Sequence, residues 1–70
     1  MKNRIYVELA EECSELIQAS TKHIKGKKDS RKRLVEEIAH VQMKMASVVE
    51  DLKIQPEELL EEYRKKGVKI

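Results

Sequence analysis

The sequence predicts an all-α protein: an antiparallel helical hairpin plus a short third helix, assembling into an oligomeric helix bundle. Apolar residues recur three and four positions apart over two long segments, which is typical of amphipathic helices. The chain has no Trp or Phe, so its core must be aliphatic, which suits helix packing better than a sheet. Its 70 residues form at most one domain, residues 1–70, and such a domain buries only about 60% of its unfolded surface. Because the single cysteine excludes an intramolecular disulfide, we expect self-association to supply stability.

The first helix is predicted from Asn3 to about Lys25. Its apolar and small residues follow the helical spacing of three and four. They are Ile5, Leu9, Cys13, Leu16, Ile17, Ser20 and Ile24. Gly26 is the expected stop, since glycine adopts the left-handed conformation common just after a helix end.

The second helix is predicted to start at Ser30, which is a good N-cap residue. It carries a regular apolar stripe with alternating spacings of four and three. The stripe consists of Leu34, Ile38, Val41, Met45, Val48 and Leu52. Two such helices joined by a short basic loop predict an antiparallel hairpin.

A third helix is predicted over about residues 56 to 66. Pro56 suits the first turn of a helix, Glu57 and Glu58 are favourable in that turn, and Lys65 and Lys66 are favourable in the last one. The simplest role for this helix is to shield the end of the hairpin; covering the nucleotide or a subunit interface is the alternative.

The charge is unevenly distributed rather than large. Lys and Arg number 15 against 13 Asp and Glu, a net charge of +2, which alone does not argue for nucleic-acid or membrane binding. Residues 21–33 (TKHIKGKKDSRKR) are strongly basic. No apolar run approaches the roughly 20 residues that span a bilayer, and no signal-peptide hydrophobic region follows the N-terminal MKNR. We therefore expect a cytoplasmic protein without a membrane partner.

Acidic residues on the first helix form one stripe. Glu8, Glu12 and Glu15 are four and three residues apart, so their side chains are neighbours that repel one another unless cations are present. On the second helix, Glu37 and His40 are three apart, beside the apolar stripe. A closed hairpin brings Glu12, Glu15, Glu37 and His40 around one point, and such oxygen-rich sites suit Mg²⁺ or Mn²⁺. The competing interpretation is an ordinary solvated helix face.

Two segments resemble a known family. Residues 9–20 (LAEECSELIQAS) and 34–46 (LVEEIAHVQMKMA) look like the paired EExxE and ExxD helices of the MazG-like, all-alpha nucleoside triphosphate pyrophosphohydrolases. The resemblance implies that Glu12, Glu15 and Glu37 are Mg²⁺ ligands. It also implies cleavage of nucleoside triphosphates between the α and β phosphates, giving a monophosphate and pyrophosphate. In that reaction Glu11 or Glu15 would help to orient the attacking water.

The chain departs from the family motif at its last position, where His40 replaces the expected Asp. Imidazole is a softer ligand that suits Zn²⁺, Mn²⁺ or Fe²⁺ better than Mg²⁺. Three outcomes are open: a changed metal preference, weaker metal binding with a compensating carboxylate such as Asp51 or Glu36, or a family member that no longer catalyses.

The basic residues suggest where substrate phosphates would bind, and they also suggest alternatives. We expect phosphate contacts from the basic loop and from the second helix, at Lys22, Lys25, Lys28 and Lys44. For Lys44, a surface ion pair with Asp51 or Glu36 is an equal alternative. The second hypothesis for the function is a catalytically inactive MazG-like helical module that acts by self-association and partner binding. A third, nucleic-acid binding through residues 22–33, is not favoured because this loop lacks aromatic residues for base stacking.

Overall fold

The structure is a computed structural model, and it describes residues 3–69. Over this range the chain is all-helical, with α1 at Asn3–Ile24, α2 at Ser30–Leu52 and α3 at Pro56–Lys65. The predicted fold class and the three predicted helices are therefore confirmed, with ends within about one residue of the prediction. None of the helices in the described range is both long enough and apolar enough to cross a membrane.

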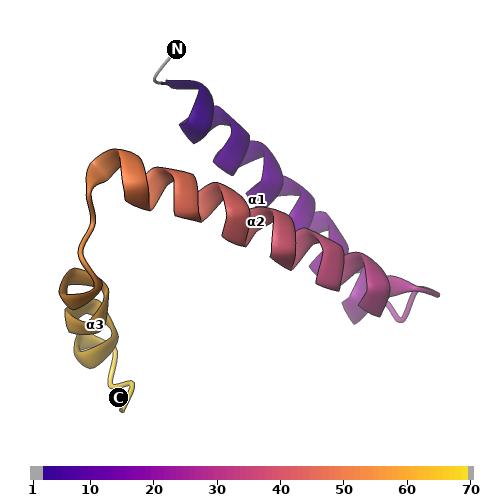
Figure 1. Cartoon of the computed structure of the whole chain (residues 1–70). Helices are drawn as coiled ribbons and strands as arrows, with labels where there is room; N and C mark the ends of the chain where they lie inside the picture. The colour runs from indigo at the N-terminus through magenta and orange to yellow at the C-terminus, as the bar shows by residue number, and fades with distance from the viewer. Residues whose placement is uncertain (1–2, 70) are drawn as a thin grey trace.

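α1 and α2 run in opposite directions side by side and form the hairpin (Figure 1). The turn between them uses two left-handed residues. Gly26 has φ 72°, as expected for a residue just after a helix end. Asp29 has φ 62° and occupies the N-cap position of α2, so Ser30 is the first helical residue rather than the cap. The Ser30 hydroxyl instead lies 2.9 Å from Nδ1 of His23 at the end of α1, which ties the two sides of the turn together.

The hairpin has a small and partly polar core. Ala19 and Val41 are the buried apolar residues among those described, and Glu37 is buried with them at 4% exposure. The small side chain of Ala19 permits close approach of the two helices next to the turn. At the opposite end, the Tyr6 hydroxyl donates a 2.6 Å hydrogen bond to Asp51, which raises the pKa of Tyr6.

The apolar stripe predicted on α2 is only half correct. Ile38, Met45 and Leu52 are 44–56% exposed, so they do not face α1. The line of contact instead runs through better-buried residues of α2, which include Leu34, Glu37, Val41, Lys44 and Val48. Both stripes have three- and four-residue spacing and share their three remaining apolar members. The repeat therefore did not determine which way the helix is rotated.

α3 stands apart from the hairpin (Figure 1). It follows a linker in which Lys53 adopts a left-handed conformation with φ 54°. The Glu58 carboxylate accepts a 2.6 Å hydrogen bond from the backbone N–H of Gln55, so α3 has a local start signal of its own. Within residues 3–69, α3 packs against neither α1 nor α2. The expectation that it shields the end of the hairpin is wrong.

Candidate metal centre

Three side chains from the two long helices meet in the middle of the hairpin. Glu12 comes from α1, and Glu37 and His40 come from α2 one turn apart. One possible ligand atom of each lies within 4.8 Å of the other two. Nδ1 of His40 is 3.4 Å from Oε2 of Glu12 and 3.8 Å from Oε2 of Glu37. We call these three residues the carboxylate–histidine cluster.

The cluster contains two oxygens without a partner. Oε2 of Glu12 and Oε2 of Glu37 are both buried and have no hydrogen-bond partner among the described residues. Buried carboxylate oxygens are costly unless a cation or a proton neutralises them. The other oxygen of Glu37 is already paired, with Nε of Arg33 at 3.1 Å. The unsatisfied oxygens are therefore those that face His40.

The distances within the cluster are compatible with a shared ion. Ligand atoms about 2.1 Å from one metal ion lie roughly 3.0–3.4 Å from each other, depending on the coordination geometry. The two separations from Nδ1 of His40, 3.4 and 3.8 Å, are close to this range. They are longer than the roughly 2.7–2.9 Å of a charge-assisted hydrogen bond. A small change of side-chain rotamers would therefore allow one cation to bind all three ligand atoms.

The electrostatics around Glu37 also favour a cation. Burial is the main cause that raises the pKa of Glu37, and the negative charge of Glu15 is the next. Arg33 opposes this by lowering the pKa, whereas the charge of Glu12 raises it further. Three carboxylates thus share a partly dehydrated space with one arginine, and a divalent cation would relieve their repulsion.

The structure brings together some of the site residues predicted from the sequence and leaves others apart. Glu12, Glu37 and His40 meet as predicted. Glu15 lies beside Glu37, but it is not among the three residues of the described cluster. Glu11, predicted to be catalytic with Glu15, is exposed.

The two carboxylates considered as replacements for the family Asp lie elsewhere. Asp51 accepts the hydrogen bond from Tyr6. Glu36 lines a hollow on the outer side of α2. Neither belongs to the cluster found in the described residues. Of the two ways in which the site was expected to tolerate His40, compensation by one of these carboxylates therefore lacks support from the geometry.

The predicted phosphate-binding lysines divide into two groups. Nζ of Lys44 forms a 2.9 Å ion pair with Glu8, one helical turn from His40. The other three, Lys22, Lys25 and Lys28, are exposed near the turn. Lys25 is 13 residues after Glu12, which is about 20 Å along a helix. Of the predicted lysines, Lys44 is therefore the one placed near the cluster.

Sequence reasoning missed the pairing of Glu8. Its carboxylate binds Lys44 across the hairpin and Arg4 one turn earlier on α1, each at 2.9 Å. The hydrogen bond from Lys44, followed by that from Arg4, lowers the pKa of Glu8. The spacing of four residues between Arg4 and Glu8 was a usable signal for half of this arrangement. The contact with Lys44 depends on how the two helices are aligned.

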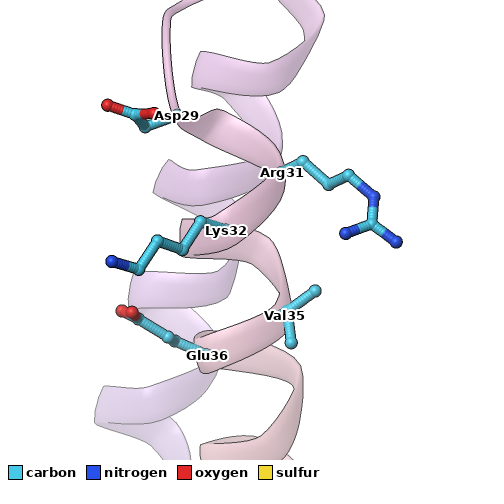
Figure 2. A pocket seen from close by; sticks show the side chains of 5 residues that line it. All are labelled: Asp29, Arg31, Lys32, Val35 and Glu36. Atoms are coloured by element: carbon cyan, nitrogen blue, oxygen red, sulfur yellow. The ribbon is translucent and has the colours of Figure 1, made fainter.

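The surface hollows do not coincide with the cluster. One lies on the outside of the first turns of α2 and is lined by Asp29, Arg31, Lys32, Val35 and Glu36. Figure 2 shows Arg31 pointing to one side and Lys32 and Glu36 to the other, so these charges do not converge. The second hollow, between the start of α1 and the end of α2, is lined by Ile5, Ser47, Glu50, Asp51 and Lys53. Neither hollow contains a residue of the cluster.

Comparisons of the chain with models of protein families, with curated proteins and with solved structures gave no match. Relatives therefore contribute nothing to the assignment. The paired acidic motifs and the geometry of the cluster are the features that point to a function.

Proposed function

We propose that the protein is a divalent-metal-dependent nucleoside triphosphate pyrophosphohydrolase of the MazG-like type, which cleaves (d)NTP to (d)NMP and pyrophosphate as a homo-oligomer, a dimer or a tetramer. One observation carries the proposal. The unpartnered buried oxygens of Glu12 and Glu37 lie beside the ring nitrogen of His40. They belong to the two helices whose sequences resemble the paired motifs of that family.

In this proposal Glu12, Glu37 and His40 hold the metal ion. When bound, the ion neutralises charge on the phosphates and lowers the pKa of a coordinated water. Glu15 lies next to Glu37 and outside the cluster, which suits it to accept a proton from the attacking water. Lys44 is near enough to contact a phosphate if it exchanges Glu8 for the substrate. The imidazole of His40 favours Mn²⁺ relative to Mg²⁺, so we propose that both ions bind and that Mn²⁺ binds more tightly.

The test is to incubate the purified chain with a panel of NTPs and dNTPs and either Mg²⁺ or Mn²⁺, and to measure monophosphate and pyrophosphate. We expect turnover by the native chain and its loss in Glu37→Gln. Glu36→Gln is the matched control, because Glu36 is the adjacent exposed glutamate and is outside the cluster. Absence of turnover across the whole panel would refute the enzymatic proposal.

The inactive helical module is the second candidate, and one observation favours it. Many large apolar side chains of both helices are exposed, which is expected of a chain that works by association. Under this alternative a chelator leaves partner binding unchanged. Under the enzymatic proposal a chelator abolishes turnover.

A further inference from the structure

The two carboxylate oxygens of Glu37 have different surroundings. Oε1 is 3.1 Å from Nε of Arg33, which lies one helical turn earlier on α2. Oε2 is buried, has no hydrogen-bond partner among the described residues, and is 3.8 Å from Nδ1 of His40. One oxygen of this carboxylate is therefore held by a guanidinium, and the other faces the carboxylate–histidine cluster.

Burial helps to keep this arrangement in place. The side chain of Glu37 is 5% exposed, whereas that of Arg33 is 44% exposed. Because Glu37 is almost completely buried, little water can replace the guanidinium as the partner of Oε1. A buried carboxylate oxygen that loses its partner is costly. The ion pair with Arg33 therefore persists unless another cation takes its place on Oε1.

Arg33 differs from the other basic residues near the turn. Residues 22–33 contain seven Lys and Arg residues. In the part of the chain that the structure describes, Arg33 is the one among these seven that forms an ion pair. Arg31, two positions earlier, instead extends out beside α2 (Figure 2). The contact with Glu37 is thus specific to Arg33 and is not a general effect of the basic segment.

The ion pair restricts how Glu37 can bind a metal ion. A carboxylate binds an ion through one oxygen or through both. Binding through both oxygens would place the ion next to the guanidinium of Arg33, which carries charge of the same sign, so the ion pair would have to break. Binding through Oε2 alone leaves the ion pair intact.

This restriction separates divalent ions by their preferred coordination. Ca²⁺ takes about six to eight oxygen ligands at about 2.3–2.6 Å and often binds both oxygens of a carboxylate. Mg²⁺ requires nearly octahedral geometry at about 2.0–2.1 Å, and Mn²⁺ is also found in octahedral sites. A cluster in which Glu37 offers one oxygen therefore suits the smaller ions better than Ca²⁺.

We propose that Arg33 is a positioning residue that restricts Glu37 to one ligand oxygen and thereby makes the cluster select Mn²⁺ or Mg²⁺ over Ca²⁺. This inference rests on the metal site of the proposed function, but it concerns which ion binds and not which reaction follows. The guanidinium suits the role because it is permanently charged and has a fixed geometry. Outer partners of metal ligands commonly fix the orientation of the ligand in this way.

The test is calorimetric titration of Mn²⁺ and of Ca²⁺ into the metal-free chain at one pH, without nucleotide. Arg33→Met removes the guanidinium and keeps a long side chain on the helix. The ratio of the Ca²⁺ dissociation constant to the Mn²⁺ dissociation constant should fall by about 3- to 10-fold, as expected for loss of a half-exposed charged hydrogen bond that only Ca²⁺ has to break. Since both ions carry the same charge, removal of a positive charge by itself leaves this ratio nearly unchanged.

Two further variants make the test specific. Arg31→Met removes the same charge two positions away and should keep the native ratio. Arg33→Lys keeps a cation four residues before Glu37, a spacing at which the two side chains are neighbours on a helix, and should retain most of the selectivity. An ion pair that only stabilises the helix would give the native ratio in all three variants.

Two results would overturn the inference and leave the metal site standing. They are a native ratio in Arg33→Met, and an equal fall of the ratio in Arg31→Met. A native chain that binds neither ion would refute the inference together with the metal site. If Arg33→Met does not fold, the native chain still decides, because Ca²⁺ binding as tight as Mn²⁺ binding would contradict the selection. The expected ratios in a chain that does not turn over nucleotides would support this inference and refute the enzymatic proposal alone.

Discussion

The two sides of the hairpin use the same backbone and the same residue spacing for opposite purposes. The polar side holds Glu8, Glu12 and Glu15 against His40 and Lys44. The opposite side, which we call the apolar face, carries the exposed side chains of Ile17, Ile24, Val35 and Ile38. The polar side has buried carboxylate oxygens without a hydrogen-bond partner among the described residues, and the other side has exposed apolar side chains.

The polar side contains a residue that lowers the stability of the hairpin. A hairpin built for stability alone would place an apolar residue at the position of Glu37, which is buried between the helices at 4% exposure. Placing a carboxylate there leaves an oxygen without a partner. Departures from the local rule for an apolar seam are expected at functional sites and need compensation elsewhere.

The strongest test of the polar side is Glu37→Gln. The change keeps the size and one hydrogen-bond acceptor but removes the charge and the ligand oxygen that faces His40. Affinity for Mn²⁺ should fall by more than the roughly 10- to 100-fold that loss of an outer partner of a ligand costs. The measurement is calorimetric titration of Mn²⁺, with and without a non-hydrolysable nucleotide.

Glu36→Gln is the control for this titration as well, and its affinity should equal that of the native chain. If Glu37→Gln binds Mn²⁺ as well as Glu36→Gln does, the cluster is not a metal site. The polar side would then be an ordinary charged surface.

The three helices were predictable from the sequence, because their ends depend on local signals such as Gly26 and Pro56. The meeting of Glu12 with Glu37 and His40 was also predictable, since a short turn fixes the alignment of the two helices. The rotation of α2 was not predictable, because the two competing stripes share Leu34, Val41 and Val48. The separation of α3 from the hairpin was not predictable either, since an amphipathic pattern does not specify which surface the apolar side of a helix packs against.

The next test concerns the packing of α1 against α2. Ala19 is 1% exposed at the point where α1 and α2 approach closely, so Ala19→Leu should force the helices apart. Overpacking of this kind typically costs about 1–3 kcal/mol in the free energy of unfolding. Urea unfolding at fixed protein concentration measures it. Ala39→Leu, at an exposed position of α2, should cost much less. Equal effects would mean that the helices do not pack at Ala19.

A smaller effect should appear in the dependence of stability on pH. The pKa of Glu37 is raised above 4.5 in the folded chain, so between 4.5 and the raised value the folded state binds more protons than the unfolded state. The stability of the metal-free protein should therefore fall as pH rises through this window. Glu8 acts in the opposite direction and at lower pH. Its pKa is lowered below 4.5, so its contribution is lost as pH falls through the folded value.

The Tm of the metal-free chain, measured at fixed protein concentration, separates the two carboxylates. Glu37→Gln should flatten the profile above pH 4.5, and Glu8→Gln should flatten it below. Bound Mn²⁺ should reverse the upper slope, because the ion binds a charged Glu37 and a neutral His40, and both forms are favoured as pH rises. A Glu37→Gln profile that coincides with the native one above pH 4.5 would show that the pKa of Glu37 is not raised in the folded chain.

The smallest expected effect comes from Lys44→Gln. This variant is informative because the affinity for the cation and the affinity for the nucleotide should change in opposite directions. Loss of Lys44 leaves Glu8 paired with Arg4 alone and removes one positive charge about one helical turn from the cluster. At roughly 6 Å in water this strengthens binding of a divalent cation by about fourfold at an ionic strength of about 0.1 M. If Lys44 also contacts a substrate phosphate, nucleotide binding should weaken in the same variant. Mn²⁺ titration and nucleotide titration of one protein therefore distinguish a residue that only balances charge from one that binds substrate, and weakening of both would show that Lys44 instead holds the cluster in shape.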